Sequence, residues 1–262
     1  MFEGIRKEAI DFLIGIKLNN NETYYRDHLD VYEKEIKIPM RELCAALAST
    51  VHAVDPDLDT RPGSVISRLR RDTRFTQDKS PFRDHVWMGW RYPGERRSEG
   101  FHMYWGFGPS WMGWGCGSYG TDRPLMDNFR QTLIREPDRV RDAIYAKNFQ
   151  GRYVISGEHY KKMTVPESVP EGLRSFYTLK YLNADLNATE EDWHLLQTSE
   201  FLERMIEEIN AMAPLLCLMK EIRAGDIATP LEAKQAESEP PVAEPTGSTG
   251  KVVVRRLEEF EF

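Results

Sequence analysis

The sequence predicts an α+β fold, in which a central, mainly antiparallel and aromatic-rich sheet has N-terminal and C-terminal helices packed on it. Apolar residues recur at helical spacing at both ends, whereas the middle is rich in aromatic residues and bounded by Gly and Pro. The two patterns are segregated and do not alternate, which argues against a parallel βαβ arrangement. The 262 residues, of which 40% are hydrophobic, are enough to bury a sizeable core.

The N-terminal part is expected to be helical. Apolar residues recur at helical spacing over residues 2–13, and a second helix is expected from about Glu22 onward. Pro39 is expected to kink this helix or to occupy a new first turn, because proline lacks the amide hydrogen that a helix interior needs. An apolar stripe then follows residues 40–51.

The middle of the chain is expected to form strands. Residues 65–69 alternate between apolar and polar, and residues 86–92 and 101–107 combine aromatic side chains with flanking Gly and Pro. Residues 111–119 interleave glycines with larger side chains, so the glycines share one face if the segment is extended. That face has room for a bulky group, and we expect a neighbouring aromatic ring to fill it.

The C-terminal third returns to helical patterns. Helices are expected over residues 124–134 and 138–149, with Glu136-Pro137 separating them. Thr189 is a good N-cap, because Asp192 follows three residues later and can complete a capping box. A long amphipathic helix is expected to follow residue 200.

The composition divides the chain into three parts. Residues 1–225 are expected to form a single domain, since they contain no internal break and no repeat. Residues 226–250 are rich in Pro, Glu, Ser, Thr and Gly and have few large apolar side chains, which predicts a disordered linker. Residues 251–262 regain Val, Leu and Phe among charges and have the character of a docking segment.

Charge and cysteine content exclude several classes of protein. The net charge of −7 argues against a surface that is basic throughout, as a general nucleic-acid or anionic-membrane binder would need. Three cysteines far apart predict neither a disulfide framework nor a zinc finger. The N-terminus lacks the pattern of a secretion signal, and the longest apolar stretch, residues 213–219, is too short to span a bilayer. We therefore expect a cytoplasmic protein without a membrane partner.

The negative net charge hides a basic segment. Residues 61–97 contain ten bases and four acids, so this segment carries +6. One interpretation is an ion-pair network, in which the arginines are paired with carboxylates nearby or elsewhere in the chain. The other is an anion site, because the planar guanidinium group binds phosphate or carboxylate through two parallel hydrogen bonds.

The centre of this segment also carries a family resemblance. It reads Arg71-Asp72-Thr73-Arg74-Phe75-Thr76-Gln77-Asp78-Lys79-Ser80-Pro81-Phe82-Arg83. This pattern resembles the signature of an uncharacterised family of conserved hypothetical proteins, domain of unknown function 2461. The N-terminal Asn19-Asn20-Asn21-Glu22 stretch is similar to that family as well, and the resemblance extends over about residues 1–222. It implies one domain with an arginine-rich shared centre and no established activity.

The leading hypothesis is that this centre binds a small anionic ligand, a phosphate or a carboxylate, over the aromatic sheet. The charge would come from Arg68, Arg71, Arg74, Lys79 and Arg83. Asp72 and Asp78 would orient these cations, and His85 and Tyr119 would complete the pocket.

Two other hypotheses remain open. In the first, the protein is an enzyme that uses proton transfer by His85 or nucleophilic attack by Cys116 near that site. In the second, residues 251–262 dock as a peptide, either on a protein partner or on their own domain. No cofactor is assigned, and no histidines have the spacing of a metal-ligand pair. A nucleic-acid partner is not expected, although aromatic and basic residues are interleaved as in single-strand binding sites.

Overall fold

The computed structural model describes residues 1–74, 76–95, 100–118 and 120–225. The linker and docking segment assigned to residues 226–262 lie outside this part of the chain. The helices in order are α1 (Lys7–Leu18), α2 (Glu22–Asp27), α3 (Leu29–Val31), the π-helix η1 (Tyr32–Lys37), α4 (Ile38–Val54), α5 (Pro62–Val65), α6 (Arg123–Arg135), α7 (Pro137–Ile144), the 3-10 helix η2 (Glu171–Leu173), α8 (Arg174–Tyr177), α9 (Glu190–Leu195) and α10 (Phe201–Ala224). The strands are β1 (Val86–Trp90), β2 (Phe101–Gly108), β3 (Trp111–Ser118), β4 (Val154–Ser156) and β5 (Asn183–Asn187).

The five strands form one sheet in the order β1-β2-β3-β5-β4, and every neighbouring pair is antiparallel. This confirms the predicted α+β class and the predicted antiparallel sheet. β4 and β5 were not predicted. β5 contains two Asn and one Asp, residues with low strand propensity, and its extended conformation depends on pairing with β3 on one side and β4 on the other.

Local helix signals in the sequence are confirmed at several places. Pro39 lies in the first turn of α4, directly after the π-helical turn η1. Thr189 and Asp192 form the expected capping box of α9. The strand expected at residues 65–69 is wrong, because Pro62 begins the short helix α5 and Ile66 then makes only an isolated bridge to Met88.

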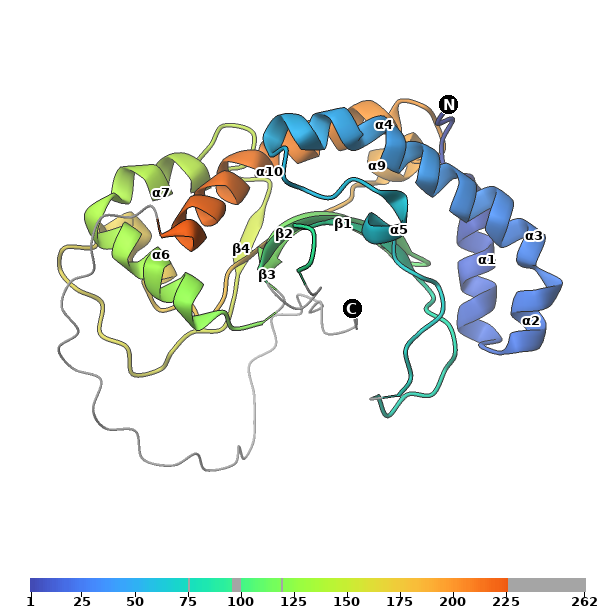
Figure 1. Cartoon of the computed structure of the whole chain (residues 1–262), viewed down its shortest axis with the longest axis horizontal. Helices are drawn as coiled ribbons and strands as arrows, with labels where there is room; N and C mark the ends of the chain where they lie inside the picture. The colour runs from blue at the N-terminus through green and yellow to red at the C-terminus, as the bar shows by residue number, and fades with distance from the viewer. Residues whose placement is uncertain (75, 96–99, 119, 226–262) are drawn as a thin grey trace.

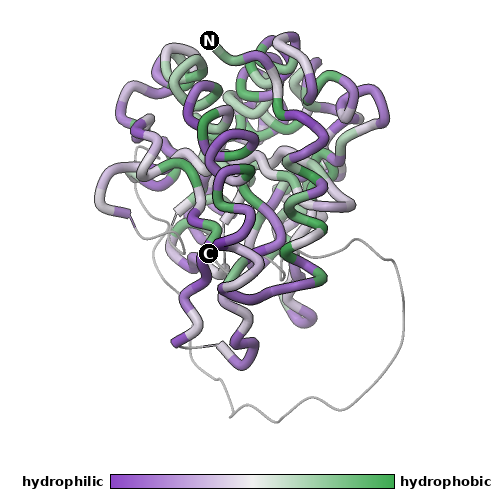
Figure 2. Tube along the Cα trace, turned by 90° about the vertical axis from the view of Figure 1, so that its right-hand side faces the viewer, coloured by the Kyte–Doolittle hydropathy of each residue, from purple (hydrophilic) through white to green (hydrophobic). Residues whose placement is uncertain are grey.

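The helices cover the convex face of a curved sheet (Figure 1). α10 packs on β2 and β3, where the ring centres of Trp105 and Phe201 are 5.3 Å apart. The indole Nε1 of Trp114 donates a hydrogen bond to Sδ of Met205 at 3.0 Å. Hydrophobic segments lie toward the interior and hydrophilic ones toward the outer loops (Figure 2). Within the described residues, no helix has both the length and the apolar character needed to cross a membrane.

The strand register gives the sheet two different faces. Trp105 and Trp114 point to the helices, together with Cys116. The opposite side, here called the concave face, carries alternate residues of the same strands. Its residues other than glycine are Trp87, His102, Tyr104, Trp111, Val154, Ser156, Asn183, Asp185 and Asn187.

Side chains of the concave face lie across its glycines, as expected from the sequence. A Cβ atom added at Gly115 would be 2.4 Å from the hydroxyl oxygen of Tyr104. A Cβ atom added at Gly108 would be 2.7 Å from the indole nitrogen of Trp111. One added at Gly106 would be 2.8 Å from Cβ of Trp87 and 3.2 Å from the Trp111 ring. Glycine is therefore required here by the close approach of aromatic rings to the backbone.

We expect the Gly115→Ala substitution to lower the free energy of unfolding by about 1–3 kcal/mol. The Tyr104 side chain can move aside, but the added methyl would also lie 2.8 Å from the carbonyl oxygen of Ala184, which is held in β5. Urea denaturation measures the effect. Gly172→Ala is the control, because nothing lies within 4 Å of its added Cβ. Equal stability of the two variants would contradict the packing argument.

Candidate functional site

Most of the basic segment forms a projecting, hairpin-like loop that leads into the first residue of β1, here called the arm (residues 68–74 and 76–84; Figure 1). Its two sides are joined by hydrogen bonds from the Arg71 amide to the Pro81 carbonyl at 2.9 Å and from the Arg83 amide to the Leu69 carbonyl at 2.8 Å. Leu69 and Phe82 are buried and attach the arm to the core. The arm contains six basic and three acidic residues.

Asn20 fixes the arm to the N-terminal helices. Its side-chain amide donates to the carbonyl of Phe82 at 2.8 Å and accepts from the amide of Phe82 at 3.0 Å. Next to it, Arg70 forms two hydrogen bonds with the carboxylate of Glu22, at 2.6 and 2.9 Å. The Asn-Asn-Asn-Glu stretch noted in the sequence is thus the surface that receives the arm.

Two of the predicted site arginines are paired within the arm. Arg71 forms an ion pair with Asp78, and Nη2 of Arg74 lies 2.6 Å from Oδ2 of Asp72. The hydrogen bond from Arg74 lowers the pKa of Asp72 to about 2, so this carboxylate is ionised at neutral pH. The ion-pair interpretation of the sequence therefore describes these two arginines. The Arg74–Asp72 pair is exposed and open to screening by salt, whereas only 15% of the Arg71 side chain is exposed.

Arg83 is placed differently. Its Nη1 donates to the carbonyl oxygens of Arg68 and Arg70, at 3.0 and 3.1 Å. Its guanidinium carbon lies 5.0 Å from the centre of the Trp87 ring. The backbone of the arm thus holds a cation over an aromatic side chain of the concave face.

His85 adjoins the same place and is buried. Its ring centre is 5.5 Å from that of Trp87 and 5.8 Å from that of Trp111. Its Nδ1 lies 2.9 Å from Oδ1 of Asp84, which fixes the ring orientation. The hydrogen bond with His85 lowers the pKa of Asp84 and is the largest cause of that shift.

The remaining predicted residues are farther from this cluster or outside it. Lys79 is exposed and donates to the carbonyl of Thr73 at 2.7 Å. Arg68 is exposed, and within the described ranges its guanidinium makes no hydrogen bond or ion pair. Tyr119 lies outside the described residues. The structure thus gathers Arg83 and His85 over Trp87 and Trp111, while the other cations are distributed along the arm.

A second polar group lies on the concave face and was not predicted. The hydroxyl of Tyr104 donates to the carboxylate of Asp185, and Ser156 lies on the same face of the neighbouring strand β4. Burial raises the pKa of Asp185 above its usual value. The alternation of β2 alone places Tyr104 on the glycine side of the sheet, but the partner Asp185 could be found only from the pairing of β5 with β3.

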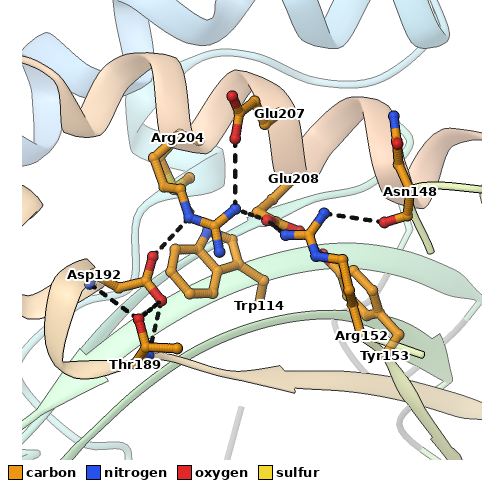
Figure 3. Close-up of polar contacts among 10 residues, drawn as sticks. Trp114, Asn148, Arg152, Tyr153, Thr189, Asp192, Arg204, Glu207 and Glu208 are labelled. Carbon is orange, nitrogen blue, oxygen red and sulfur yellow. Dashed lines mark hydrogen bonds and ion pairs between the residues drawn. The ribbon is translucent and has the colours of Figure 1, made fainter. Parts of the chain in front are cut away.

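A charged network lies on the opposite, helix-covered side of the sheet (Figure 3). Nε of Arg204 lies 2.6 Å from Oδ1 of Asp192, and Arg204 also pairs with Glu208. Arg152 pairs with the same carboxylate, and the hydroxyl of Tyr153 donates to it at 2.7 Å. The carboxylate of the fully buried Glu208 has three hydrogen-bonding partners, Arg152, Tyr153 and Arg204. The network therefore has a structural role, because it connects α10 with α9 and with residues 148–153.

Cys116 lies on the helix-covered side of β3 and is fully buried. Burial raises the pKa of its thiol well above the usual range. The thiol is therefore protonated at neutral pH, whereas an activated nucleophile would be a thiolate.

An open hollow of about 430 Å³ lies at the other end of the strands, beside Gly100, Ser118 and the end of α10. Two of its charged side chains are engaged: Asp122 caps α6 and Arg223 pairs with Glu95. Among the described residues, no three His, Cys, Asp or Glu side chains are grouped as metal ligands would be. A ligand in this hollow would thus compete with the cap of α6 and with the Arg223–Glu95 pair.

A family model described as a conserved hypothetical protein, DUF2461, matches residues 8–217. The chain belongs to the DUF2461 family. The matched range of this DUF2461 chain includes the arm, all five strands and most of α10. No curated protein matches the sequence.

Removal of the Asn20 side chain is expected to loosen the arm. We expect Asn20→Ala to lower the free energy of unfolding by about 1–3 kcal/mol, because the amide and carbonyl of Phe82 both lose their partner. Hydrogen exchange at the Phe82 amide should accelerate. Asn19→Ala is the control, since the Asn19 side chain, at the C-cap of α1, donates locally to the carbonyl of Gly15 and does not contact the arm within the described residues. Unchanged exchange at Phe82 would refute this role.

Asp185 predicts a pH dependence of stability. Because its pKa is raised in the folded state, the folded chain holds a proton that the unfolded chain releases above a pKa of about 3.9. Above that pH, ionisation favours the unfolded chain, so the wild type loses stability as the pH rises. Asp185→Asn removes the ionisable group but keeps an acceptor for Tyr104. The variant should therefore gain stability relative to the wild type between pH 4 and 7, by about 1.4 kcal/mol for each unit by which the pKa of Asp185 is raised.

Urea denaturation at the two pH values measures this difference. Asp11→Asn, at an exposed pair with Lys7 on α1, should show little change between pH 4 and 7. A stability difference for Asp185→Asn that stays constant over this range would rule out the raised pKa.

Proposed function

We propose that this DUF2461 protein binds a small anionic ligand, a phosphate or a carboxylate, where the arm meets the concave face. The observation that carries the proposal is the position of Arg83. Two backbone carbonyls hold its guanidinium group over Trp87, beside His85 and Trp111. A cation held in this way needs little reorganisation when an anion binds.

The chemistry of the surrounding residues supports the same conclusion. Guanidinium groups bind phosphate and carboxylate oxygens in a planar, two-point geometry, and the indole rings lower the local exposure to water. The excess of bases in the arm makes the surrounding potential positive and favours the approach of an anion.

The internal ion pairs of the arm are compatible with this role. Asp72 and Asp78 form ion pairs with Arg74 and Arg71, so they are in a position to orient these cations. The Arg74–Asp72 pair is exposed, and an exposed pair contributes little to stability, so an incoming anion can take over Arg74 from its carboxylate at low cost. Arg68 and Lys79 then contribute through their charge.

Thermal unfolding with inorganic phosphate, pyrophosphate and citrate tests the proposal, at an ionic strength held constant with NaCl. A ligand that binds the folded state raises the melting temperature as its concentration passes the dissociation constant. We expect such a shift for the wild type and its loss in Arg83→Gln.

The matched control is Arg141→Gln, which removes one arginine from an exposed pair with Asp138 on α7. This variant should keep the whole ligand-dependent shift. The proposal fails if the wild type shows no shift with any of the three anions, or if Arg83→Gln and Arg141→Gln respond alike.

A further inference from the structure

The arm and the concave face match, in charge and in chemistry, a segment of the same chain. We propose that residues 257–262 dock on the concave face of their own domain, with their glutamates toward the arm. This inference rests on the proposed function, because it assigns the same cationic surface an occupant within the chain. It makes the segment an internal competitor of small anions.

The segment has two chemically distinct sides. Residues 257–262 read Leu-Glu-Glu-Phe-Glu-Phe and lie outside the described part of the chain. In an extended conformation Glu258, Phe260 and Phe262 would share one side, and Leu257, Glu259 and Glu261 would share the other. One side therefore carries both phenylalanines, and the other carries two of the three glutamates.

The docking surface has the complementary two parts. The sheet offers the partly exposed indole ring of Trp111, on which a phenylalanine ring packs favourably. Trp87 is buried beside His85 and under Arg83, so it supports the cation and is not itself a docking ring. The arm offers the guanidinium group of Arg83 at its base. Glutamates hydrogen-bond to guanidinium groups in the same geometry as a free carboxylate. An extended segment can thus meet an aromatic ring with one side and a cation with the other.

The length of the linker fits the distance to be crossed. α10 ends at Ala224, and Arg223 lies beside Gly100, next to the first residue of β2. The arm leaves β1 at Val86, which pairs with Phe107 near the last residue of β2. The eight residues of β2 span about 25 Å.

The 31 residues 226–256 lie between the end of the described helix and the segment. At up to about 3.3 Å per residue a chain of this length can reach well beyond 25 Å, so the linker is long enough to cross the span.

The edge of the sheet on this side is already covered. The amide of Ser67 donates to the carbonyl of Trp87 at 2.9 Å, and the amide of Asp59 donates to the carbonyl of Arg91 at 2.9 Å. Residues 59–67 thus occupy the outer side of β1. A docked segment would lie on the concave face and would not extend the sheet beyond β1.

The test compares two variants of the full chain that lose the same charge. The first carries Glu258→Gln, Glu259→Gln and Glu261→Gln in the segment. The matched control carries Glu237→Gln, Glu239→Gln and Glu244→Gln in the linker. Hydrogen–deuterium exchange of peptides from residues 251–262 and from the arm reports docking, and calorimetric titration with inorganic phosphate reports competition.

We expect the segment amides to be protected in the wild type and in the linker control, and to lose protection in the segment variant. Arg83→Gln should abolish the protection, whereas Arg141→Gln should not. Phosphate should bind the segment variant about fivefold or more tightly than the linker control, because the competitor is removed.

Three results would overturn the inference: unprotected segment amides in the wild type, equal protection in both glutamine variants, or protection that rises with protein concentration. The last result would assign the segment to a second copy of the chain. If phosphate binds both variants with equal affinity, the proposed anion binding is supported but the segment does not compete with it. If the segment is protected but phosphate binds no variant, docking is supported and the proposed small-anion ligand is contradicted.

Discussion

The packing of Trp105 and Trp114 against α10 is the constraint on which the rest of the structure depends. The two residues are paired across β2 and β3, and both are buried against Phe201. Aromatic side chains of this size dominate the energy of a core, so they determine which face of the sheet is covered by helices. Because side chains alternate along a strand, the glycines and polar residues of β2 and β3 must then lie on the other face.

The charged network on the helix side of the sheet is positioned by the same packing. Arg204 lies over Trp114 with its guanidinium carbon 5.0 Å from the ring centre, and it reaches Asp192 and Glu208 from there (Figure 3). Removing one member of such a group would leave an unpaired buried charge, which is strongly destabilising. The network therefore fixes the rotation of α10 about its axis, and with it the position of Phe201 over the two tryptophans.

The parts of the fold that could be predicted from the sequence are those with local causes. Pro39 and the Thr189 cap act within one helical turn, and the aromatic alternation of β2 is contained within eight residues. β5 could not be predicted, since its polar residues are extended only because distant strands pair with it. The same limit applies to the site. The basic segment was visible, whereas the choice of partners for Arg71 and Arg83, and the meeting of Tyr104 with Asp185, depend on how the arm and β5 are placed.

The attachment of the arm by Asn20 makes the arm depend on the N-terminal helices. Asn20 and Phe82 are 62 positions apart, and Glu22 and Arg70 are 48 apart. Neither contact can persist when residues 19–22 separate from the rest of the fold. A local opening of the N-terminal helices, which needs no more free energy than global unfolding, would therefore release the arm and with it the cationic surface.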